Sequence, residues 1–279
     1  MKVLIIGKDG QLGSELVRLI HGSKGTSRRN TSDNYLDLKD PDMVMDRLSS
    51  DDPDVVINAA AQTNVDRCEE DKLDAYTVNA LAVRSMARAC SKTGSYFIHV
   101  STDYIFDGQK GNYTEEDVPN PINYYGISKA IGEAYALSYD NSLVIRTSGV
   151  YGIKMNFPFF VVKTLREGGT VNCIDSYYSP IHATMLAEGI KEVIVKSPHG
   201  VLNISGRRIS RYEFAIRIKD TLNIDTGTIN LSRSVPNMKA NRPYDSSLDN
   251  KKAHSILSMK FEDLNKSIEY LRKVKQDSI

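Results

Sequence analysis

The chain has 279 residues, with 36 lysine and arginine against 35 aspartate and glutamate side chains, for a formal net charge of +1. This balance excludes the strong electrostatic attraction typical of proteins that bind nucleic acids or membrane surfaces. The three cysteines cannot close a disulfide framework and do not follow a metal-binding spacing. No apolar run reaches the roughly 20 residues of a membrane span. We therefore expect a cytoplasmic protein with no nucleic-acid or membrane partner and no metal site.

Short apolar runs alternate with helical patterns through the first half of the chain. The runs are Lys2–Ile6, Val55–Asn58, Tyr96–Val100 and Leu143–Arg146. Their nearly continuous apolar character is typical of strands buried on both faces of a sheet. Between the second and third runs, Asp71–Lys92 repeats apolar residues with a helical period. The alternation predicts an α/β fold, a Rossmann-type doubly wound parallel sheet.

A glycine-rich turn follows the first predicted strand directly. Gly7, Gly10 and Gly13 precede a helical stretch at residues 14–20. In a dinucleotide-binding turn the first glycine permits a tight bend, the second lets the backbone approach the phosphates, and the third lets helix and sheet pack closely. The spacing is one residue longer at its front than the usual fingerprint. The pattern predicts a pyrophosphate site at a helix N-terminus, with an ordinary strand-to-helix turn as the alternative.

The residues after the first helix bear on the choice of nicotinamide cofactor. An acidic residue in this region usually holds the ribose 2′-hydroxyl of NAD, whereas arginine accommodates the 2′-phosphate of NADP. Here Arg28 and Arg29 are adjacent, and Asp33 is the only acidic residue in the window 21–34. We therefore favour NADP(H) over NAD(H), with a solvated basic loop as the alternative interpretation of the arginines.

Three side chains have the chemistry of a hydride-transfer site. Thr102 follows the strand that ends at Val100, where ligands of open parallel sheets bind. Tyr125 and Lys129 are four residues apart in a helical stretch and share one face. A nearby ammonium favours the phenolate and brings the tyrosine pKa, ordinarily about 10, toward the range useful for acid–base catalysis. Lys129 can also bind the nicotinamide ribose, and Thr102 can hydrogen-bond the substrate oxygen.

Asn79, midway along the helical stretch Asp71–Lys92, is a further candidate for the site. It could hold a water molecule or brace Lys129. The alternative is a buried asparagine that only satisfies the backbone.

The pattern becomes less regular after about residue 150, where prolines and glycines separate shorter elements. Residues 1–150 are therefore expected to form an NAD(P)-binding Rossmann domain. Residues 151–279 are expected to form mainly a smaller substrate-binding domain, with some segments returning to the Rossmann sheet. The spacing of apolar residues in Phe261–Val274 predicts an amphipathic closing helix. The polar stretch at residues 22–34 predicts a surface loop with at most a very short strand.

Motifs of one protein family run in order through nearly the whole chain. They are GKDGQLG at 7–13, YLDLKD at 35–40, PDVVINAAAQTNVDRCEED at 53–71, AYTVNA at 75–80, STDYIFDG at 101–108, YTEEDVPNPINYYGISKAIGE at 113–133, RTSGVYG at 146–152 and RPYDSSLD at 242–249. On these motifs the chain resembles the extended short-chain dehydrogenase/reductase superfamily and, within it, the dTDP-4-dehydrorhamnose reductases.

The resemblance implies contacts with a bound cofactor. The implied cofactor-binding residues are Gln11, Leu12 and Gly13 at the pyrophosphate and ribose, Asp37 and Leu38 beside the adenine, and Ala60, Ala61 and Gln62 along the nicotinamide half. It also implies that Tyr125 is the proton donor, Lys129 its partner and Thr102 the ligand of the substrate oxygen, and that Asp103 holds a sugar hydroxyl. The implied reaction is hydride transfer to C4 of dTDP-4-dehydro-6-deoxy-L-mannose, which gives dTDP-L-rhamnose.

Two departures from the family pattern fall on the substrate side. The family usually has a tryptophan after RTS, whose plane contacts the sugar, and this chain has Gly149. The family stretch D-Q-x-G-x-P-T corresponds here to Asp175–Ile181, which keeps the aspartate and the proline only. A different nucleotide sugar, or a different pose of the same one, therefore remains an alternative.

Other functions on the same fold are alternatives to the reductase. One enzyme alternative is a nucleotide-sugar epimerase or 4,6-dehydratase. The non-enzymatic alternative is an NAD(P)-binding regulatory subunit that resembles that of methionine adenosyltransferase. The intact set of Thr102, Tyr125 and Lys129 favours an active reductase. A homodimer is left open.

Overall fold

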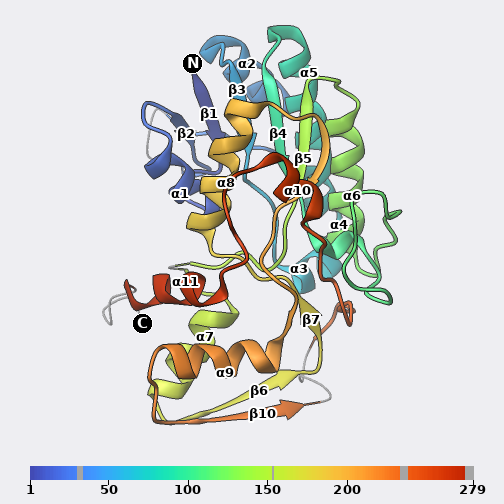
Figure 1. Cartoon of the computed structure of the whole chain (residues 1–279). Coiled ribbons are helices and arrows are strands. Elements are labelled where there is room, and N and C mark those ends of the chain that lie inside the picture. The colour runs from blue at the N-terminus through green and yellow to red at the C-terminus, as the bar shows by residue number, and fades with distance from the viewer. Residues whose placement is uncertain (30–33, 153, 233–237, 274–279) are drawn as a thin grey trace.

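The computed structural model describes residues 1–29, 34–152, 154–232 and 238–273. A parallel six-stranded sheet forms the larger part of the molecule (Figure 1). Across the sheet the strands are β2 (Lys24–Thr26), β1 (Val3–Ile6), β3 (Val55–Asn58), β4 (Tyr96–Val100), β5 (Ser142–Arg146) and β8 (Gly200–Asn203). The chain leaves β1 toward β2 and returns to β3 on its other side. Ligands of doubly wound sheets bind at the carboxyl ends of strands beside such a switch point, here between β1 and β3.

Helices cover both faces of this sheet, which is why its strands are apolar on both sides. One face packs on α1 (Gln11–Leu19) and α8 (Ala183–Lys196), and the other on α2 (Pro41–Asp51), α5 (Ala82–Thr93) and α6 (Tyr124–Leu137). Successive residues of each strand point into the cores on opposite faces of the sheet. In β1, Ile5 lies in the core against α1 and α8, and Leu4 and Ile6 lie in the core against α2, α5 and α6. The predicted α/β class, a Rossmann-type doubly wound sheet, is confirmed.

The predicted helix over residues 71–92 contains an interruption that the sequence did not predict. The stretch consists of α4 (Lys72–Tyr76), a π-helical turn (Thr77–Leu81), which is the interruption, and α5. A π turn carries one extra residue and rotates the following face. Val78, one of the apolar residues that repeat with a helical period in this stretch, is only half-buried, while Asn79 is 1% exposed. The extra residue therefore turns a polar side chain into the protein beside the sheet.

A smaller unit with its own apolar core lies below the carboxyl edge of the sheet in Figure 1. It contains α7 (Phe157–Arg166), β6 (Thr170–Ile174) paired with β10 (Thr228–Ser232), β7 (Tyr177–Tyr178) paired with β9 (Ile209–Ser210), and α9 (Arg211–Thr221). Between these segments the chain returns to the large sheet as α8 and β8, and later as α10 (Lys251–Ile256) against β8.

The predicted closing helix Phe261–Val274 is wrong at its start and in its continuity. Helix α11 covers only Leu264–Glu269, followed by a 3₁₀ turn at Tyr270–Lys273. The Asp263 side chain caps the helix by accepting from the Lys266 N–H over 3.0 Å, so the helix begins after Phe261. Val274 lies outside the described residues.

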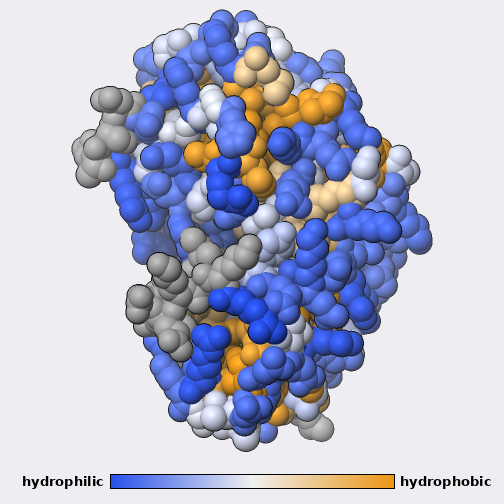
Figure 2. All heavy atoms as spheres, turned by 60° about the vertical axis from the view of Figure 1, so that its left-hand side comes forward, coloured by the Kyte–Doolittle hydropathy of each residue, from blue (hydrophilic) through white to orange (hydrophobic). Residues whose placement is uncertain are grey.

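The described surface agrees with the balanced composition. The face in Figure 2 is largely hydrophilic, with apolar areas over both parts of the molecule. Within the described ranges, no helix has the length and apolarity to cross a membrane, and no group of three potential metal-binding side chains occurs. The three cysteines are free and buried.

Candidate active site

The glycine turn joins β1 to α1 with very little space around it. Gly7 has φ +87°, in the left-handed region that favours glycine, and a Cβ there would lie 2.8 Å from Ala60 Cβ. A Cβ at Gly13 would lie 2.1 Å from the carbonyl oxygen of Gly7, so the start of α1 packs directly on the turn. Gly10, which caps α1, provides no side-chain hydrogen bond to the first helical N–H groups. These groups can therefore receive an anion.

The two side chains that follow Gly10 differ in their position. Leu12 is buried in the core between the sheet and α8, so only its backbone can face a ligand at the turn. The Gln11 amide accepts from the Lys154 N–H over 3.0 Å and thereby ties the loop after β5 to the glycine turn. The Gln11 side chain is therefore engaged with the protein, and its backbone N–H belongs to the first turn of α1.

The segment Ala60–Gln62, which follows β3 across the switch point from Gly7, is held by two buried asparagines. The Ala60 N–H donates to Asn58 Oδ1 over 3.1 Å, and the Gln62 N–H donates to Asn79 Oδ1 over 2.8 Å. Asn79 Nδ2 in turn donates to the Gln62 carbonyl at 3.1 Å and to Ser128 Oγ at 3.0 Å. Asn79 therefore braces this segment and the residue beside Lys129, rather than Lys129 itself.

The residues expected near the adenosine end lie beside the edge strand β2. Arg28 and Arg29 are exposed directly after β2. The Arg29 N–H donates to Ser27 Oγ over 3.0 Å, and Ser27 hydrogen-bonds Asp9 of the glycine turn. Asp37 and Leu38 are half-buried on the same side. Asp33 lies outside the described residues.

Thr102, Tyr125 and Lys129 lie at the carboxyl edge of β4. Helix α6 is capped by the Asn123 side chain, which accepts from the Gly126 N–H at 2.8 Å, and this cap places Tyr125 in the first turn of the helix. Thr102 lies close to the Tyr125 hydroxyl, and its side chain favours the phenolate. Lys129, one turn further on, is 1% exposed and donates to the Val100 carbonyl over 2.7 Å. The structure therefore places the three predicted side chains at the carboxyl end of β4, with Tyr125 and Lys129 one turn apart on α6.

Burial dominates the electrostatics of this group. It lowers the pKa of Lys129 from 10.5 to about 8, because the ammonium loses its hydration. It raises the pKa of Tyr125 well above the ordinary range, and the nearby Thr102 side chain opposes this rise only in part. The sequence predicted a lowered pKa for Tyr125, whereas the protein without a bound cofactor raises it.

Asp103, expected to hold a sugar hydroxyl, is engaged with the protein on both oxygens. Ser148 donates to Oδ2 at 2.6 Å, Ser246 donates to the same atom at 2.5 Å, and Thr102 donates to Oδ1 at 3.1 Å. The carboxyl group is 2% exposed, and this burial raises its pKa. Asp103 thus connects three of the family motifs (STDY, RTS and RPYDSS) in one buried hydrogen-bond network.

Arg211 and Tyr178 occupy the substrate side beside Gly149. Gly149 has φ +47°, and a Cβ there would lie 2.6 Å from the Tyr178 ring. The Arg211 guanidinium lies 4.3 Å from the centroid of that ring and close to Tyr104, whose ring lies 5.9 Å from that of Tyr125. Sequence reasoning did not single out Arg211, because the rings it contacts, Phe157 and Tyr178, lie far from it along the chain.

His99 and Asn58 were also not singled out. Both are fully buried polar residues at the ends of predicted apolar strands, which is the signal that could have found them. His99 Nε2 lies 3.3 Å from Lys129 Nζ.

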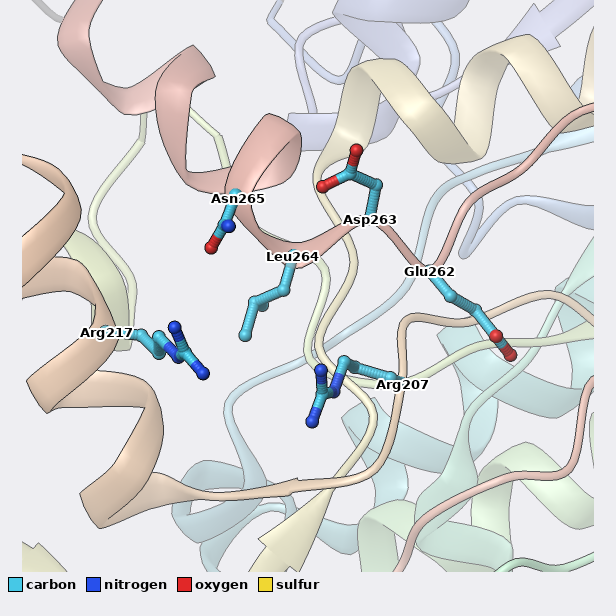
Figure 3. Close-up of a pocket in the computed structure, with 6 residues that line it drawn as sticks. All are labelled: Arg207, Arg217, Glu262, Asp263, Leu264 and Asn265. Carbon is cyan, nitrogen blue, oxygen red and sulfur yellow. The ribbon is translucent and has the colours of Figure 1, made fainter.

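A separate hollow of about 400 Å³ lies between α9 and α11 (Figure 3). Arg207, Arg217 and Leu264 line it, and Arg217 and Leu264 point toward one another. It includes none of the predicted site residues.

Comparisons with known proteins agree with this geometry. Residues 1–275 match the family described as RmlD substrate binding domain. A dTDP-4-dehydrorhamnose reductase from Aggregatibacter actinomycetemcomitans is 31% identical, over 97% of this chain and 98% of that protein. A structure described as a hypothetical dTDP-4-dehydrorhamnose reductase from Sulfolobus tokodaii is 48% identical, with a TM-score of 0.91 over 95% of this chain and 98% of that one. The Bacillus anthracis reductase, solved in complex with NADP, is 27% identical, with a TM-score of 0.89 over 96% and 97%.

The fold and the site define an NAD(P)H-dependent reductase of the extended short-chain dehydrogenase/reductase type. The chain belongs to the RmlD family, and the resemblance to dTDP-4-dehydrorhamnose reductases is confirmed.

Proposed function

We propose that the protein reduces the C4 carbonyl of a nucleotide-diphosphate sugar with NADPH, and that the sugar is dTDP-4-dehydro-6-deoxy-L-mannose. The observation that carries the proposal is the placement of Thr102, Tyr125 and Lys129 at the carboxyl end of β4, the strand next to β3 at the switch point. The relatives named above as dTDP-4-dehydrorhamnose reductases support the choice of sugar.

The residues around the glycine turn fit a bound dinucleotide. The uncapped N-terminus of α1 and the close packing of Gly7 and Gly13 suit a pyrophosphate. Arg28 and Arg29, exposed at the end of β2, suit a 2′-phosphate, because two guanidiniums match its charge and geometry. The Bacillus anthracis relative in complex with NADP supports this preference. NADPH, when bound, would supply the hydride that C4 of the sugar takes up.

The chain's own residues would control the proton in this reaction. Tyr125 would donate its phenolic proton to the C4 oxygen as that oxygen gains negative charge. Thr102 would orient the Tyr125 hydroxyl and the sugar oxygen through its own hydroxyl. Lys129 would hold the nicotinamide ribose and stabilise the phenolate that remains after the transfer.

The substrate-side departures are one change in packing. Tyr178 fills the space where a side chain at Gly149 would lie, so a larger residue at position 149 would need a different arrangement of Tyr178. Arg211, stacked on Tyr178, adds a cation to this wall. We propose that this wall adjoins the sugar and accounts for any difference in sugar preference from the relatives.

The test is the loss of NADPH absorbance with dTDP-4-dehydro-6-deoxy-L-mannose, compared with UDP- and GDP-linked 4-ketosugars at equal concentration. We expect consumption of NADPH with the dTDP sugar and the highest kcat/KM among the three. A higher kcat/KM for another nucleotide would reassign the substrate. Tight NADPH binding without consumption in any arm would instead indicate a binding protein.

A further inference from the structure

Asn58, His99 and Lys129 form a buried polar chain that ends at the proposed acid–base pair. Asn58 and His99 are register partners in neighbouring strands and are both fully buried. The Asn58 amide nitrogen lies 3.1 Å from His99 Nδ1, and His99 Nε2 lies 3.3 Å from Lys129 Nζ. Buried polar atoms cost free energy unless they are paired, so the direction of each hydrogen bond matters.

Ala60 fixes the direction of the chain at its first member. The Ala60 N–H donates to Asn58 Oδ1 over 3.1 Å, so the NH₂ group of Asn58 faces His99. The reversed amide would set two donors against each other at Ala60. Because His99 Nδ1 accepts, the neutral imidazole carries its proton on Nε2. Burial, together with Lys129, lowers the pKa of His99, which keeps the ring neutral.

The Nε2–H of His99 therefore points at Lys129 Nζ. An ammonium has three donors and no acceptor, whereas a neutral amine has a lone pair. Lys129 already donates to the Val100 carbonyl over 2.7 Å. The contact with His99 is thus a hydrogen bond when Lys129 is an amine, and an opposition of two donors when Lys129 is an ammonium.

The charged groups around Lys129 do not cancel this effect. Glu133, one turn along α6, favours the ammonium, but it is bound to Arg146 from β5 in a buried ion pair at 2.9 Å. Among the residues that the structure describes, no carboxylate is ion-paired with Lys129. Tyr125, one turn back on α6, is kept neutral by burial.

The titratable groups on the other elements packed near Lys129 act on Tyr125 and not on Lys129 itself. Cys68 from α3 (Val65–Glu70), Asp103 and Tyr104 act on Tyr125 and disfavour its phenolate. Asn79 of the π turn is uncharged and bonds Ser128.

We propose that His99 is a positioning residue whose Nε2–H, oriented by Asn58, eases the loss of the Lys129 proton and holds Nζ beside Val100. The ease with which Lys129 loses its proton influences Tyr125, because the ammonium favours the phenolate and the amine favours the phenol that gives a proton to a reduced carbonyl. The kinetic consequence rests on the proposed reductase function, whereas the titration of Lys129 does not.

The direct test is the titration of Lys129 in the full-length protein without added dinucleotide. It follows the ¹³C shift of Lys129 Cε in protein labelled with ¹³C-lysine, with the signal assigned by its absence in Lys129→Met. His99→Gln puts an amide oxygen within reach of Nζ as an acceptor, so the Lys129 pKa should rise by about one unit. Asn58→Asp turns the histidine so that Nε2 accepts, and it should shift the Lys129 pKa in the same direction.

The matched control is Ile98→Val, which alters the neighbouring position of β4 on the other face of the sheet. Its Lys129 titration should match the wild type. If circular dichroism shows that His99→Gln is folded and its Lys129 has the wild-type pKa, the proposal is wrong. If His99→Gln does not fold, the Lys129 pKa in Asn58→Asp provides the same test.

In turnover, the alkaline limb of kcat should move to lower pH in His99→Gln. A uniform loss of kcat without that shift would mean a structural role only. Absence of turnover with every ketosugar would remove the proposed function and leave the titration result standing.

Discussion

The ring of Tyr178 occupies the space beside the α-carbon of Gly149, where a Cβ would lie 2.6 Å from the ring. The two residues come from different family motifs, and each departs from the family pattern at its own position. Their contact shows that the departures are coupled through packing. Tyr178 and Arg211, whose guanidinium lies 4.3 Å from the centroid of the Tyr178 ring, therefore form the wall beside position 149 that we propose adjoins the sugar.

Gly149→Ala should destabilise the protein by about 1–3 kcal/mol, because the new Cβ meets the Tyr178 ring and φ +47° is unfavourable for alanine. Urea denaturation measures the change. The double variant Gly149→Ala/Tyr178→Ala should lose about 1 kcal/mol less than the two single losses combined. Gly189→Ala, where a Cβ would meet only ordinary contacts, is the control. If the two single losses of stability simply added in the double variant, the contact with Tyr178 would not be what disfavours a side chain at position 149.

Tyr125→Phe should lose turnover by a factor of about 10²–10⁴ and keep NADPH binding, because only the phenolic proton is removed. Stopped-flow absorbance gives the rate, and fluorescence titration gives the affinity. Tyr124→Phe removes the neighbouring hydroxyl and should stay near the wild-type rate. A Tyr125→Phe enzyme with wild-type kcat would show that another group supplies the proton.

Replacing both Arg28 and Arg29 by alanine should weaken NADPH by about tenfold or more and leave NADH nearly unchanged, because only NADPH carries the 2′-phosphate. Isothermal titration of both cofactors measures the difference. Arg88→Ala, at an exposed position on α5, controls for loss of charge alone. Equal weakening of both cofactors would place the arginines in a solvated loop with no selective role.

Glu133 and Arg146 form a buried ion pair that fastens α6 to β5, with three contacts between 2.9 and 3.2 Å. Glu133→Gln should destabilise the protein by about 3–5 kcal/mol, because it leaves the guanidinium buried without a counter-charge. The double variant Glu133→Leu/Arg146→Met removes both charges and should lose less. Thermal and urea unfolding measure both. If the double variant were less stable than Glu133→Gln, the loss of stability would come from packing and not from the unpaired charge.

The stability contribution of Lys129 should depend on pH. The folded protein binds this proton more weakly than the unfolded chain, since burial lowers the Lys129 pKa from 10.5 to about 8. The cost of the buried ammonium is therefore fully present below about pH 8 and disappears as the pH rises toward 10.5. The free energy of unfolding of Lys129→Met, relative to wild type, should fall by about 3 kcal/mol across this window. Urea titrations of both proteins at several pH values measure the difference. A difference that does not vary with pH would mean that the Lys129 pKa is not lowered.

Local patterns sufficed to predict the sheet and the hydride-transfer group. The apolar runs, the glycine turn after β1 and the four-residue spacing of Tyr125 and Lys129 are all properties of short segments. The features that were missed depend on contacts between distant segments. The π turn at Asn79 follows from packing against α6, the engagement of Asp103 needs serines 45 and 143 residues away, and the Tyr178–Gly149 contact joins two loops. The start of α11 was missed for a different reason, because the cap at Asp263 overrode the apolar period.

The measurement that tests the central claim most directly uses NADPH deuterated at C4 of the nicotinamide, with dTDP-4-dehydro-6-deoxy-L-mannose as the acceptor. Proton NMR and mass spectrometry of the sugar product report where the deuterium goes. We expect one deuterium at C4 of the product dTDP-L-rhamnose, formed in equal amount to the NADP⁺ released, and almost none with Tyr125→Phe. Unlabelled sugar, or no NADP⁺ released in the presence of the acceptor, would contradict the proposed function.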